Sequence, residues 1–342
     1  MPTPFVTIAV PCLDEAAHIE QCVRTIQAQT YPRGALEILV ADGGSTDGTR
    51  AILARLAEGD PRIRVIDNPR RIQAAGMNAL IAVARGDVIV RMDVHCEYAA
   101  DYVEACVRVL GESGADNVGG AQRAIAKTPF QRALCAALTS PLGVGGARYR
   151  SAEAEGFVDT VFLGAFRRRV FETVGLYDPG AVTNEDAELN QRLLDRGGRI
   201  FLSRDIVVHY LPRDSFRALA KQYFRYGRGR ARTLLKHRKL TSLRPAIPAM
   251  MVAGGAALVA TSLVQPFTVP LFALYGAAVI VEAVRVGRSE GARVVPVVAA
   301  IFPTLHLAHG TGFLLGLARY ALAPDWHEAE TSPLPSGAPS AA

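Results

Sequence analysis

The chain has 342 residues, a formal net charge of +6 and 50% hydrophobic residues, enough for one large domain or two ordinary ones. Its mean hydropathy of +0.17 is high for a wholly soluble protein, and the apolar excess lies after Pro245. The five cysteines form no Cys-x-x-Cys pair and are odd in number, which favours reduced thiols over a disulfide framework or a zinc site. The start, MPTPFVTIAV, lacks the features of a signal peptide.

Strand-like and helix-like segments alternate in the first part of the chain. Apolar runs predict strands over residues 5–13, 36–44, 62–69 and 87–93. Helical patterns follow three of these runs, over residues 14–29, 46–58 and 74–86. This alternation predicts an α/β fold with a parallel sheet covered by helices on both faces.

Polar residues follow these strands at 11–15, 42–47, 68–71 and 93–95. Ligands of such sheets bind beyond the carboxyl ends of the strands, so we expect the four segments to line one rim. Asp93 and His95 are two residues apart, and in a strand they would point to the same face. Taken alone, the pair fits two interpretations equally well. One is a functional site, and the other is a strand end with a solvated aspartate and a chance histidine.

The segment VADGGSTDGT places Asp42 and Asp47 around a Gly-Gly turn. Carboxylates suit a base or ribose and repel phosphates, although an ordinary turn with a helix cap at Ser45 or Thr46 is the alternative. The absence of Walker A and G-x-G-x-x-G sequences disfavours an ATPase or a nicotinamide dehydrogenase. Asp93 and His95 could instead hold Mn²⁺ or Mg²⁺ jointly with a diphosphate, where the cation would act as a Lewis acid.

Two further polar positions are candidates. Glu185 and Asp186 begin a helix-like pattern in TNEDAELNQRLLDRG, where acids also stabilise a helix dipole. His209 ends the strand-like run IVVHYLPR and could be a third metal ligand, or a core or edge histidine.

The C-terminal part predicts a membrane region. A basic segment over about 213–244 contains one acid, Asp214, and precedes three apolar stretches over 246–264, 266–284 and 294–318. Each stretch reaches the roughly 17–25 residues that a spanning helix needs. Positive charge in the basic segment and the later loop places both on the cytoplasmic side, so the first two stretches form a hairpin.

The third apolar stretch contains Pro303, His306 and His309, and is expected either to span the membrane or to be re-entrant. The tail over 324–342 is rich in Pro, Ser and Ala and is predicted to be disordered. Because the strand and helix pattern is complete before about Arg244, we expect the domain that precedes it to fold without the apolar segments. The basic segment could bind nucleic acid, but its place before the apolar stretches favours anionic membrane lipids.

The motifs VPCLDE, ADGGSTDGT, DVIVRMDVH, FLGAFRR, NEDAELNQRL and QYFRYG occur in the order found in family 2 glycosyltransferases of the GT-A fold. The resemblance covers roughly residues 5 to 235. The Asp-x-His form, the YFRYGRGRAR run and the apolar helices resemble the ExoA-type succinoglycan and exopolysaccharide glucosyltransferases. His95 stands where most members carry a second Asp, and Gly43 replaces the second acid of Asp-Asp-Gly-Ser.

The resemblance implies a Rossmann-like GT-A nucleotide-sugar-binding domain over 1–235, followed by a helical membrane region over 246–318. It implies roles for several positions. The base and ribose would contact Pro11, Leu13, Glu15 and Asp42, and the segment approaching the nucleotide contains Arg71 and Asn78. The metal and diphosphate would lie at Asp93 and His95, and the sugar and acceptor pocket would be shaped by Gly164 and Ala165.

The remaining roles concern the acceptor side. Asp186 would be the base that deprotonates the acceptor hydroxyl in an inverting transfer, with Glu185 as the second choice. Gln222, Arg225 and Tyr226 match Gln-x-x-Arg-Trp, with Tyr226 in the Trp position, and would contact the acceptor or the diphosphate. An amphipathic interfacial helix is the alternative reading of that segment.

The expected function is transfer of glucose or a related hexose from a UDP-linked donor to a lipid-linked saccharide in exopolysaccharide or cell-surface glycan synthesis. We expect a multi-pass protein of the bacterial inner membrane with a cytoplasmic catalytic domain, acting with other glycan-assembly proteins and without nucleic acid. A non-catalytic membrane scaffold with a degenerate GT-A domain is the alternative. The presence of Asp42, Asp93, His95 and Asp186 together favours the enzyme.

Overall fold

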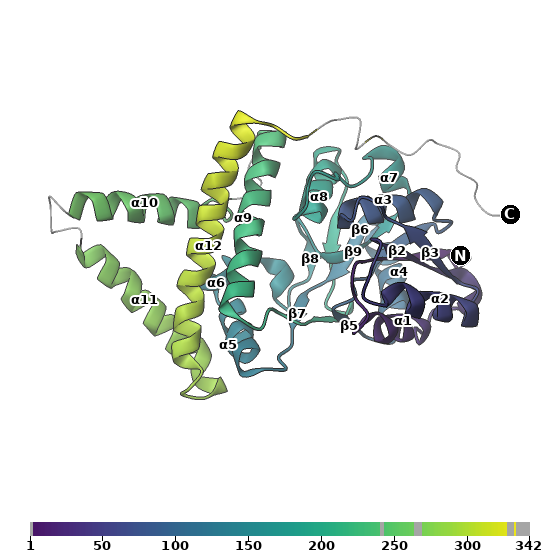
Figure 1. The fold of residues 1–342 in the computed structure, drawn as a ribbon, viewed down its shortest axis with the longest axis horizontal. Coiled ribbons are helices and arrows are strands. Elements are labelled where there is room, and N and C mark those ends of the chain that lie inside the picture. The colour runs from purple at the N-terminus through teal and green to yellow at the C-terminus, as the bar shows by residue number, and fades with distance from the viewer. Residues whose placement is uncertain (1–2, 240–242, 263–268, 327–331, 333–342) are drawn as a thin grey trace. The chain divides into compact units, whose positions relative to one another are not determined.

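The computed structural model describes residues 3–239, 243–262, 269–326 and 332 (Figure 1). The chain divides into two compact units. The first unit comprises residues 1–123, 151–210 and 326–342, and the second comprises residues 124–150 and 211–325.

The first half of the first unit has the predicted alternation. Its strands are β1 (Val6–Cys12), β2 (Leu36–Asp42), β3 (Ile63–Asp67) and β4 (Val88–Arg91). The connecting helices are α1 (Ile19–Gln27), α2 (Thr49–Gly59) and α3 (Gln73–Val83). The strands are parallel in the order β3-β2-β1-β4, which confirms the prediction of a parallel sheet for this part.

The sheet continues beyond β4 as a mixed sheet. Its further strands, in spatial order, are β9 (Phe162–Arg167), β6 (Asn117–Gly120), β10 (Ile200–Leu202) and β8 (Gly156–Phe157). A smaller sheet consists of β5 (Cys96–Tyr98), β11 (Val208–Tyr210) and β7 (Gln122–Ala124). The helices of this half are α4 (Tyr102–Ser113), α7 (Arg169–Thr173) and α8 (Glu185–Asp195). Because β9 is antiparallel to both β4 and β6, the predicted parallel arrangement holds only as far as β4.

Burial explains why the first strands form. Ile8, Ala9, Val10, Leu39 and Val40 are all fully buried, as expected for strands covered on both faces. Full burial of each such side chain stabilises the fold by about 1.5–3 kcal/mol.

The strand predicted over 87–93 ends two residues early, at Arg91. Asp93 and His95 therefore lie in the turn between β4 and β5, and the strand-alternation argument for them was wrong. The turn has its own support, because the Asp93 N–H donates to the Tyr98 hydroxyl oxygen at 2.6 Å and the Cys96 N–H donates to the Asp93 carbonyl at 3.3 Å.

The second unit is helical. Its helices are α5 (Pro129–Leu138), α6 (Pro141–Val144), α9 (Phe216–His237), α10 (Ile247–Ser262), α11 (Val269–Gly287) and α12 (Val295–Leu322). Short 3-10 turns lie at Arg148–Arg150 and Arg288–Glu290 in this unit, and at Arg33–Ala35 in the first unit.

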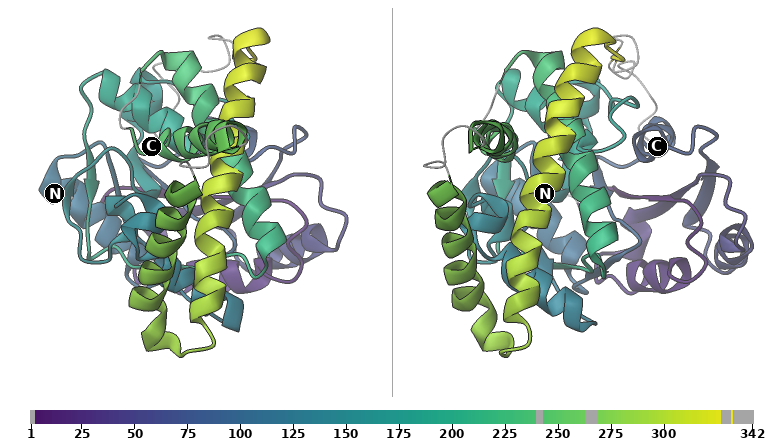
Figure 2. Two further views of the ribbon diagram at one scale, coloured as in Figure 1. Left: turned by 90° about the vertical axis from the view of Figure 1, so that its left-hand side faces the viewer. Right: turned by 60° about the vertical axis from the view of Figure 1, so that its left-hand side comes forward.

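Helices α9 and α12 run side by side (Figures 1 and 2). Glycines allow their backbones to touch, since a Cβ on Gly227 would lie 2.0 Å from the His309 carbonyl oxygen. A Cβ on Gly312 would lie 2.1 Å from the Phe224 carbonyl oxygen. The third apolar stretch thus forms α12, one of the two helices of a closely packed pair.

The third stretch is also a continuous helix of 28 residues that includes Pro303. Its polar side chain His306 is satisfied within the unit, because Nε2 lies 2.7 Å from the Leu142 carbonyl and Nδ1 lies 2.8 Å from the Tyr275 hydroxyl. The residues that suggested an interruption therefore leave the helix intact.

Residues 124–150 belong to the helical unit, although they precede β9 in the chain. Leu134 and Ala137 of α5 share a buried apolar cluster with Ile301 and Phe302 of α12. The structural units therefore do not follow the linear boundary expected near residue 235. Only the first residues of the predicted disordered tail are described, and among them Asp325 accepts from Arg232 Nε at 2.6 Å.

A chain truncated after Arg244 is expected to aggregate in detergent-free buffer, contrary to the sequence-based expectation. The truncation removes α10, α11 and α12, so the apolar face of α5 and the glycine face of α9 would meet water. Size-exclusion chromatography of this fragment without detergent checks the prediction, with a chain ending at Trp326 and purified in detergent as the folded reference. A monodisperse, detergent-free fragment ending at Arg244 would show that these faces do not need α12.

Candidate active site

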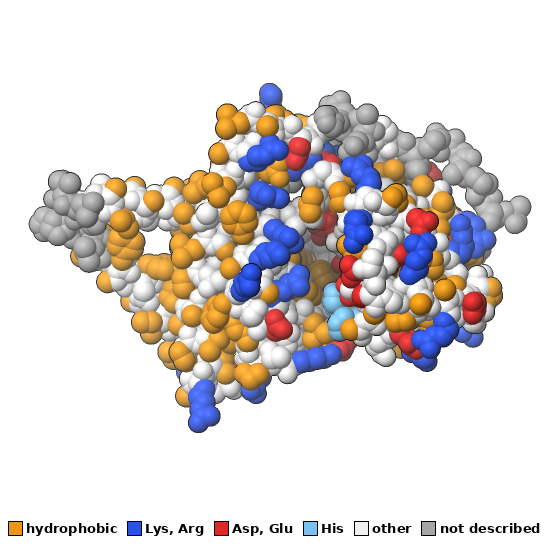
Figure 3. Space-filling model, in the orientation of Figure 1, with side chains coloured by type: hydrophobic (Ala, Val, Ile, Leu, Met, Phe, Trp, Pro, Cys, Tyr) orange, Lys and Arg blue, Asp and Glu red, His pale blue; other side chains and the backbone are white. Residues whose placement is uncertain are grey.

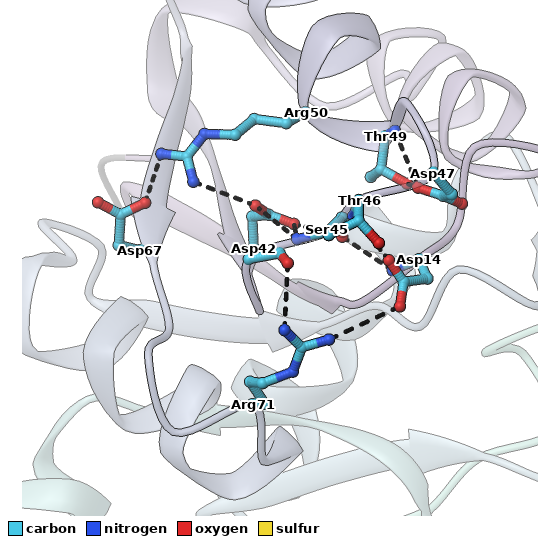
Figure 4. A network of polar contacts seen from close by, with 10 residues as sticks. Asp14, Asp42, Ser45, Thr46, Asp47, Thr49, Arg50, Asp67 and Arg71 are labelled. Atoms are coloured by element: carbon cyan, nitrogen blue, oxygen red, sulfur yellow. Dashed lines mark hydrogen bonds and ion pairs between the residues drawn. The ribbon is translucent and has the colours of Figure 1, made fainter.

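The loop after β2 is ordered by the Asp42 carboxylate (Figure 4). Asp42 is fully buried, accepts from the Ser45 hydroxyl at 2.6 Å and lies 3.4 Å from Arg50 Nη1. Its place at the end of β2 agrees with the predicted rim, but its buried oxygens serve the loop itself. A base or ribose would meet the loop that Asp42 shapes.

The loops after β1 and β2 are tied together by acid–backbone hydrogen bonds. Asp14 accepts from the Thr46 N–H at 2.9 Å, and Asp47 accepts from the Ala16 N–H at 2.9 Å. Hydrogen bonds from the Thr49 hydroxyl and from backbone N–H groups hold the pKa of Asp47 below its usual value. Neither Ser45 nor Thr46 caps α2, so the simple-turn alternative does not describe this loop.

Arg71 closes the other side of this network. Its guanidinium donates to the Gly44 carbonyl at 3.3 Å and lies 3.7 Å from an Asp14 oxygen (Figure 4). The backbone of Arg71 is left-handed, with φ of 56°, a strained conformation for a non-glycine residue that is typical of functional loops. Arg71 therefore lies beside the loop after β2, and its contact with a nucleotide stays a prediction.

Three other predicted nucleotide contacts lie at or near this rim. Pro11 is in β1, and Leu13 lies 3.1 Å from the position that a Cβ on Gly43 would take. Glu15 is largely covered and lies 2.9 Å from His95 Nε2. Asn78 has another task, since its amide group both donates to and accepts from the backbone of Tyr177, at 2.8 and 2.9 Å.

His95 faces the β1 loop. Besides Glu15, it contacts the His18 ring edge-on with 4.9 Å between centroids. Histidine side chains beside carboxylates are visible on this face in Figure 3. The rim thus gathers Glu15 and His95 as the sequence predicted, and adds His18, which the sequence analysis did not single out.

Asp93 is held by a buried arginine. Arg91 Nε donates to Asp93 Oδ1 at 2.9 Å, and Arg91 Nη2 donates to Asp93 Oδ2 at 3.1 Å. Gln73 Nε2 donates to the same Oδ2 at 3.3 Å. The third contact of the guanidinium is Glu185 Oε1, 3.0 Å from Nη1, so Arg91 joins the β4 turn to the start of α8.

The two acids at the start of α8 differ in access. Glu185 is 6% exposed, and burial raises its pKa above the usual range while the Arg91 charge lowers it. Asp186 is half-exposed, and one of its oxygens accepts from the Ala187 N–H at 2.7 Å. Asp186 can therefore meet a substrate, whereas Glu185 faces the protein interior.

Asp93 and His95 carry donor atoms of the kinds that Mn²⁺ and Mg²⁺ accept, but too few to hold a cation by themselves. Within the described part of the chain, no group of three or more His, Cys, Asp or Glu side chains is arranged to hold a metal ion. His209 lies on β11 opposite Glu97, so it is not gathered with Asp93 and His95. Asp93 and His95 supply one oxygen and one nitrogen donor, which leaves the other positions to a diphosphate.

Gly164 and Ala165 lie within β9 in the middle of the sheet. Ala165 is fully buried between Val90 and Val118, and Gly164 has φ of 88°. A Cβ on Gly164 would lie 2.7 Å from the Phe166 ring. Gly164 and Ala165 could therefore affect a sugar pocket only indirectly, through the backbone conformation of β9.

The Gln-x-x-Arg-Tyr segment lies on α9 in the second unit. Gln222 Nε2 donates to the Tyr226 hydroxyl at 3.0 Å, and Arg225 is exposed. Arg150, which was not selected from the sequence, lies close enough to Tyr226 to interact with it electrostatically. The Nε atom of Arg150 is buried and has no hydrogen-bond partner among the described residues. The segment is thus part of a polar cluster on an otherwise basic helix.

Arg91 was also missed, although a signal existed. An arginine within the apolar run DVIVRM is buried only where carboxylates pair with it, so two acidic partners could have been sought. Glu185 could not have been paired with Arg91 from sequence, because 93 residues separate them.

The family model of glycosyl transferase family 2 matches residues 7–175. The succinoglycan biosynthesis protein ExoA of Rhizobium meliloti (strain 1021) is 37% identical over 310 residues, which cover 90% of this chain and 93% of that protein. The chain belongs to glycosyl transferase family 2. A Methanococcus voltae relative, a dolichyl N-acetyl-alpha-D-glucosaminyl phosphate 3-beta-D-2,3-diacetamido-2,3-dideoxy-beta-D-glucuronosyltransferase, is 28% identical and covers 65% of this chain and 72% of its own.

Solved glycosyltransferase structures share the fold. The mannosyltransferase PcManGT from Pyrobaculum calidifontis, in complex with GDP-Man and Mn²⁺, matches with a TM-score of 0.65 over 94% of this chain and 87% of its own. Its 22% identity supports the fold alone. This family 2 glycosyltransferase therefore has the GT-A fold that the motifs predicted.

Proposed function

We propose that this family 2 glycosyltransferase moves a hexose from a nucleotide-sugar donor to a lipid-linked saccharide in exopolysaccharide or cell-surface glycan synthesis, with inversion. The observation that carries the proposal is the Arg91 bridge. It ties the Asp93 turn, where a donor diphosphate would lie, to the helix start that bears Asp186. A non-catalytic scaffold with a degenerate domain would not require the Asp93 turn and the start of α8 to be held together.

The donor side is formed by the loops after β1 and β2. Leu13, Glu15 and Arg71 surround the loop that Asp42 orders, and they would contact the base and ribose. A UDP-linked glucose or related hexose is the donor we propose, as the resemblance of the motifs to ExoA-type glucosyltransferases implies.

Asp93 and His95 would hold Mn²⁺ or Mg²⁺ together with the donor diphosphate, and the cation would neutralise charge on the leaving group. Arg91 and Gln73 orient Asp93 from the protein side. A carboxylate offers about four lone-pair sites, so Asp93 keeps acceptor capacity after these bonds.

Asp186 would take the proton of the acceptor hydroxyl as that oxygen attacks the anomeric carbon. The half-exposed position of Asp186 suits this task, whereas the carboxylate of Glu185 is committed to Arg91. Gln222, Arg225 and Tyr226 would contact the acceptor.

The acceptor is proposed to be lipid-linked because the second unit has surfaces suited to a bilayer. Among the described residues, the helical segments Pro270–Glu290 and Val295–Leu322 are long and apolar enough to cross a membrane. Helices α10 and α11 expose large apolar side chains, including Met250, Val259, Leu274 and Val281 (Figure 3).

Helix α9 has a basic surface, in contrast to the apolar surfaces of α10 and α11. Its exposed cations are spaced along one face and are Arg217, Lys221, Arg225 and Arg228. Arg232 is the exception, since it is 2% exposed and paired with Asp325. An α12 in mid-bilayer would bring the cations of its neighbour α9 into hydrocarbon, at a cost of about 2.5–3.5 kcal/mol each.

We therefore place α9 and α12 at a cytoplasmic membrane surface of anionic lipids, and α10 and α11 within the bilayer. This interfacial position of α12 differs from the spanning or re-entrant third stretch that the sequence predicted. Other glycan-assembly proteins would act on the same lipid-linked saccharide.

Turnover is expected to stop when divalent cations are chelated and to return with Mn²⁺ or Mg²⁺. The assay is nucleoside diphosphate release by the detergent-purified protein with a panel of nucleotide sugars, with and without EDTA. Full release in excess chelator would refute the metal role. No release with any donor would favour the scaffold.

A further inference from the structure

Arg91 occupies an unusual position for a charged residue. It is the last residue of β4, follows three buried apolar residues, and is itself 5% exposed. Its guanidinium donates three hydrogen bonds to carboxylate oxygens, two to Asp93 and one to Glu185.

Stability alone is a weak explanation for this cluster. Burying an arginine and a carboxylate costs several kcal/mol of desolvation, and apolar replacements of such groups are often equally stable. Moreover, one acid would suffice to pair the guanidinium, whereas here two carboxyl groups share it.

The cluster is also open at one end only. The Asp93 side chain is 27% exposed, but the side chains of Arg91 and Glu185 are 6% and 7% exposed. A ligand can therefore reach Asp93, while Arg91 acts from behind it and Glu185 fastens Arg91 to α8.

We propose that Arg91 is a positioning residue that holds Asp93 ready for the cation–diphosphate complex of the donor and keeps the first turn of α8, with Asp186, in register with it. The inference rests on the proposed function. The rigid fork of the guanidinium suits this task, because it fixes both oxygens of Asp93 in one plane and still has a donor for Glu185.

The charge of Arg91 makes a further distinction. It opposes a bare divalent cation near Asp93, but it attracts a cation that arrives with a diphosphate, because that complex carries net negative charge. Removal of Arg91 should therefore weaken binding of Mn²⁺ with UDP without weakening binding of Mn²⁺ alone. A purely structural arginine would not separate these two affinities.

The test uses Arg91→Met combined with Glu185→Gln, which removes the buried charge pair and keeps the net charge of the cluster. The matched control is Arg192→Met with Glu188→Gln, another covered ion pair on α8, with 2.8 Å between Arg192 Nη2 and Glu188 Oε2. Thermal unfolding, Mn²⁺ titration by electron paramagnetic resonance with and without UDP, and nucleoside diphosphate release are measured for the full-length protein in detergent.

We expect the Arg91 double variant to bind Mn²⁺ with UDP at least about tenfold more weakly and to turn over at least about tenfold more slowly, while binding Mn²⁺ alone no more weakly. Arg91→Lys should not restore wild-type values, because an ammonium cannot form the fork. The control pair should retain both affinities even if it unfolds at a lower temperature.

Wild-type affinity and turnover in the Arg91 double variant, or an equal loss in the control pair, would overturn the proposal. If wild-type protein binds Mn²⁺ with UDP but releases no diphosphate from any donor, the proposed function fails. The binding comparison would still decide the role of Arg91.

Discussion

Asp186→Asn is expected to reduce turnover by about 10²–10⁴-fold, the usual contribution of a general base. The substitution keeps the shape and hydrogen-bonding capacity of the side chain but removes the proton acceptor. Donor affinity should hardly change, because the proposed nucleotide and cation contacts lie on the loops after β1, β2 and β4. Steady-state diphosphate release at saturating donor, together with a UDP titration, checks both statements.

Glu185→Gln is the neighbouring control. Its amide oxygen can still accept from Arg91, so the bridge to Asp93 should persist and the loss of turnover should be smaller. A dead Glu185→Gln beside an active Asp186→Asn would assign the base to the buried carboxylate. If neither substitution changes turnover, the reaction does not use the start of α8.

Asp93→Ala is expected to abolish cation-dependent nucleotide binding, and turnover with it. The variant loses the one carboxylate of the Arg91 cluster that a ligand can reach, and the charge of Arg91 is then balanced by Glu185 alone. Without Asp93, Arg91 would repel a divalent cation and His95 alone would hold one only weakly. Titration of Mn²⁺ in the presence of UDP measures the effect directly.

Asp205→Asn serves as the matched control for Asp93→Ala, because Asp205 is an exposed aspartate that also pairs with an arginine, Arg108, at 2.8 Å. Its binding curve should superimpose on that of the wild type. Unchanged cation-dependent binding in Asp93→Ala would move the metal site away from the β4 turn.

The first four strands could be predicted because β1, β2 and β4 are buried along nearly their whole length, and because each of the first three strands is followed by a turn and a helix. The later strands β8, β9 and β10 are short, and β9 pairs with strands distant in sequence, so no local pattern reveals its antiparallel direction. Likewise, α5 gives no local sign that its partner is α12, because that contact is set by tertiary packing.

The site shows a similar division. Asp93, His95, Glu15, Asp42 and Arg71 were found because they follow predicted strands. Their exact partners were not, since Asp93 lies in a turn rather than a strand and Asp42 is consumed by its own loop. Asn78 illustrates the limit of a motif, because its amide holds the Tyr177 backbone.

The most direct test of the account is transfer of a radiolabelled sugar from a nucleotide donor into an organic-extractable, lipid-linked saccharide by the protein in anionic vesicles. We predict divalent-cation-dependent label in the lipid product with the anomeric configuration opposite to that of the donor, and little label with Asp186→Asn. Lipid label that persists undiminished in Asp186→Asn, or no transfer with any donor while the protein is folded and membrane-bound, would contradict it.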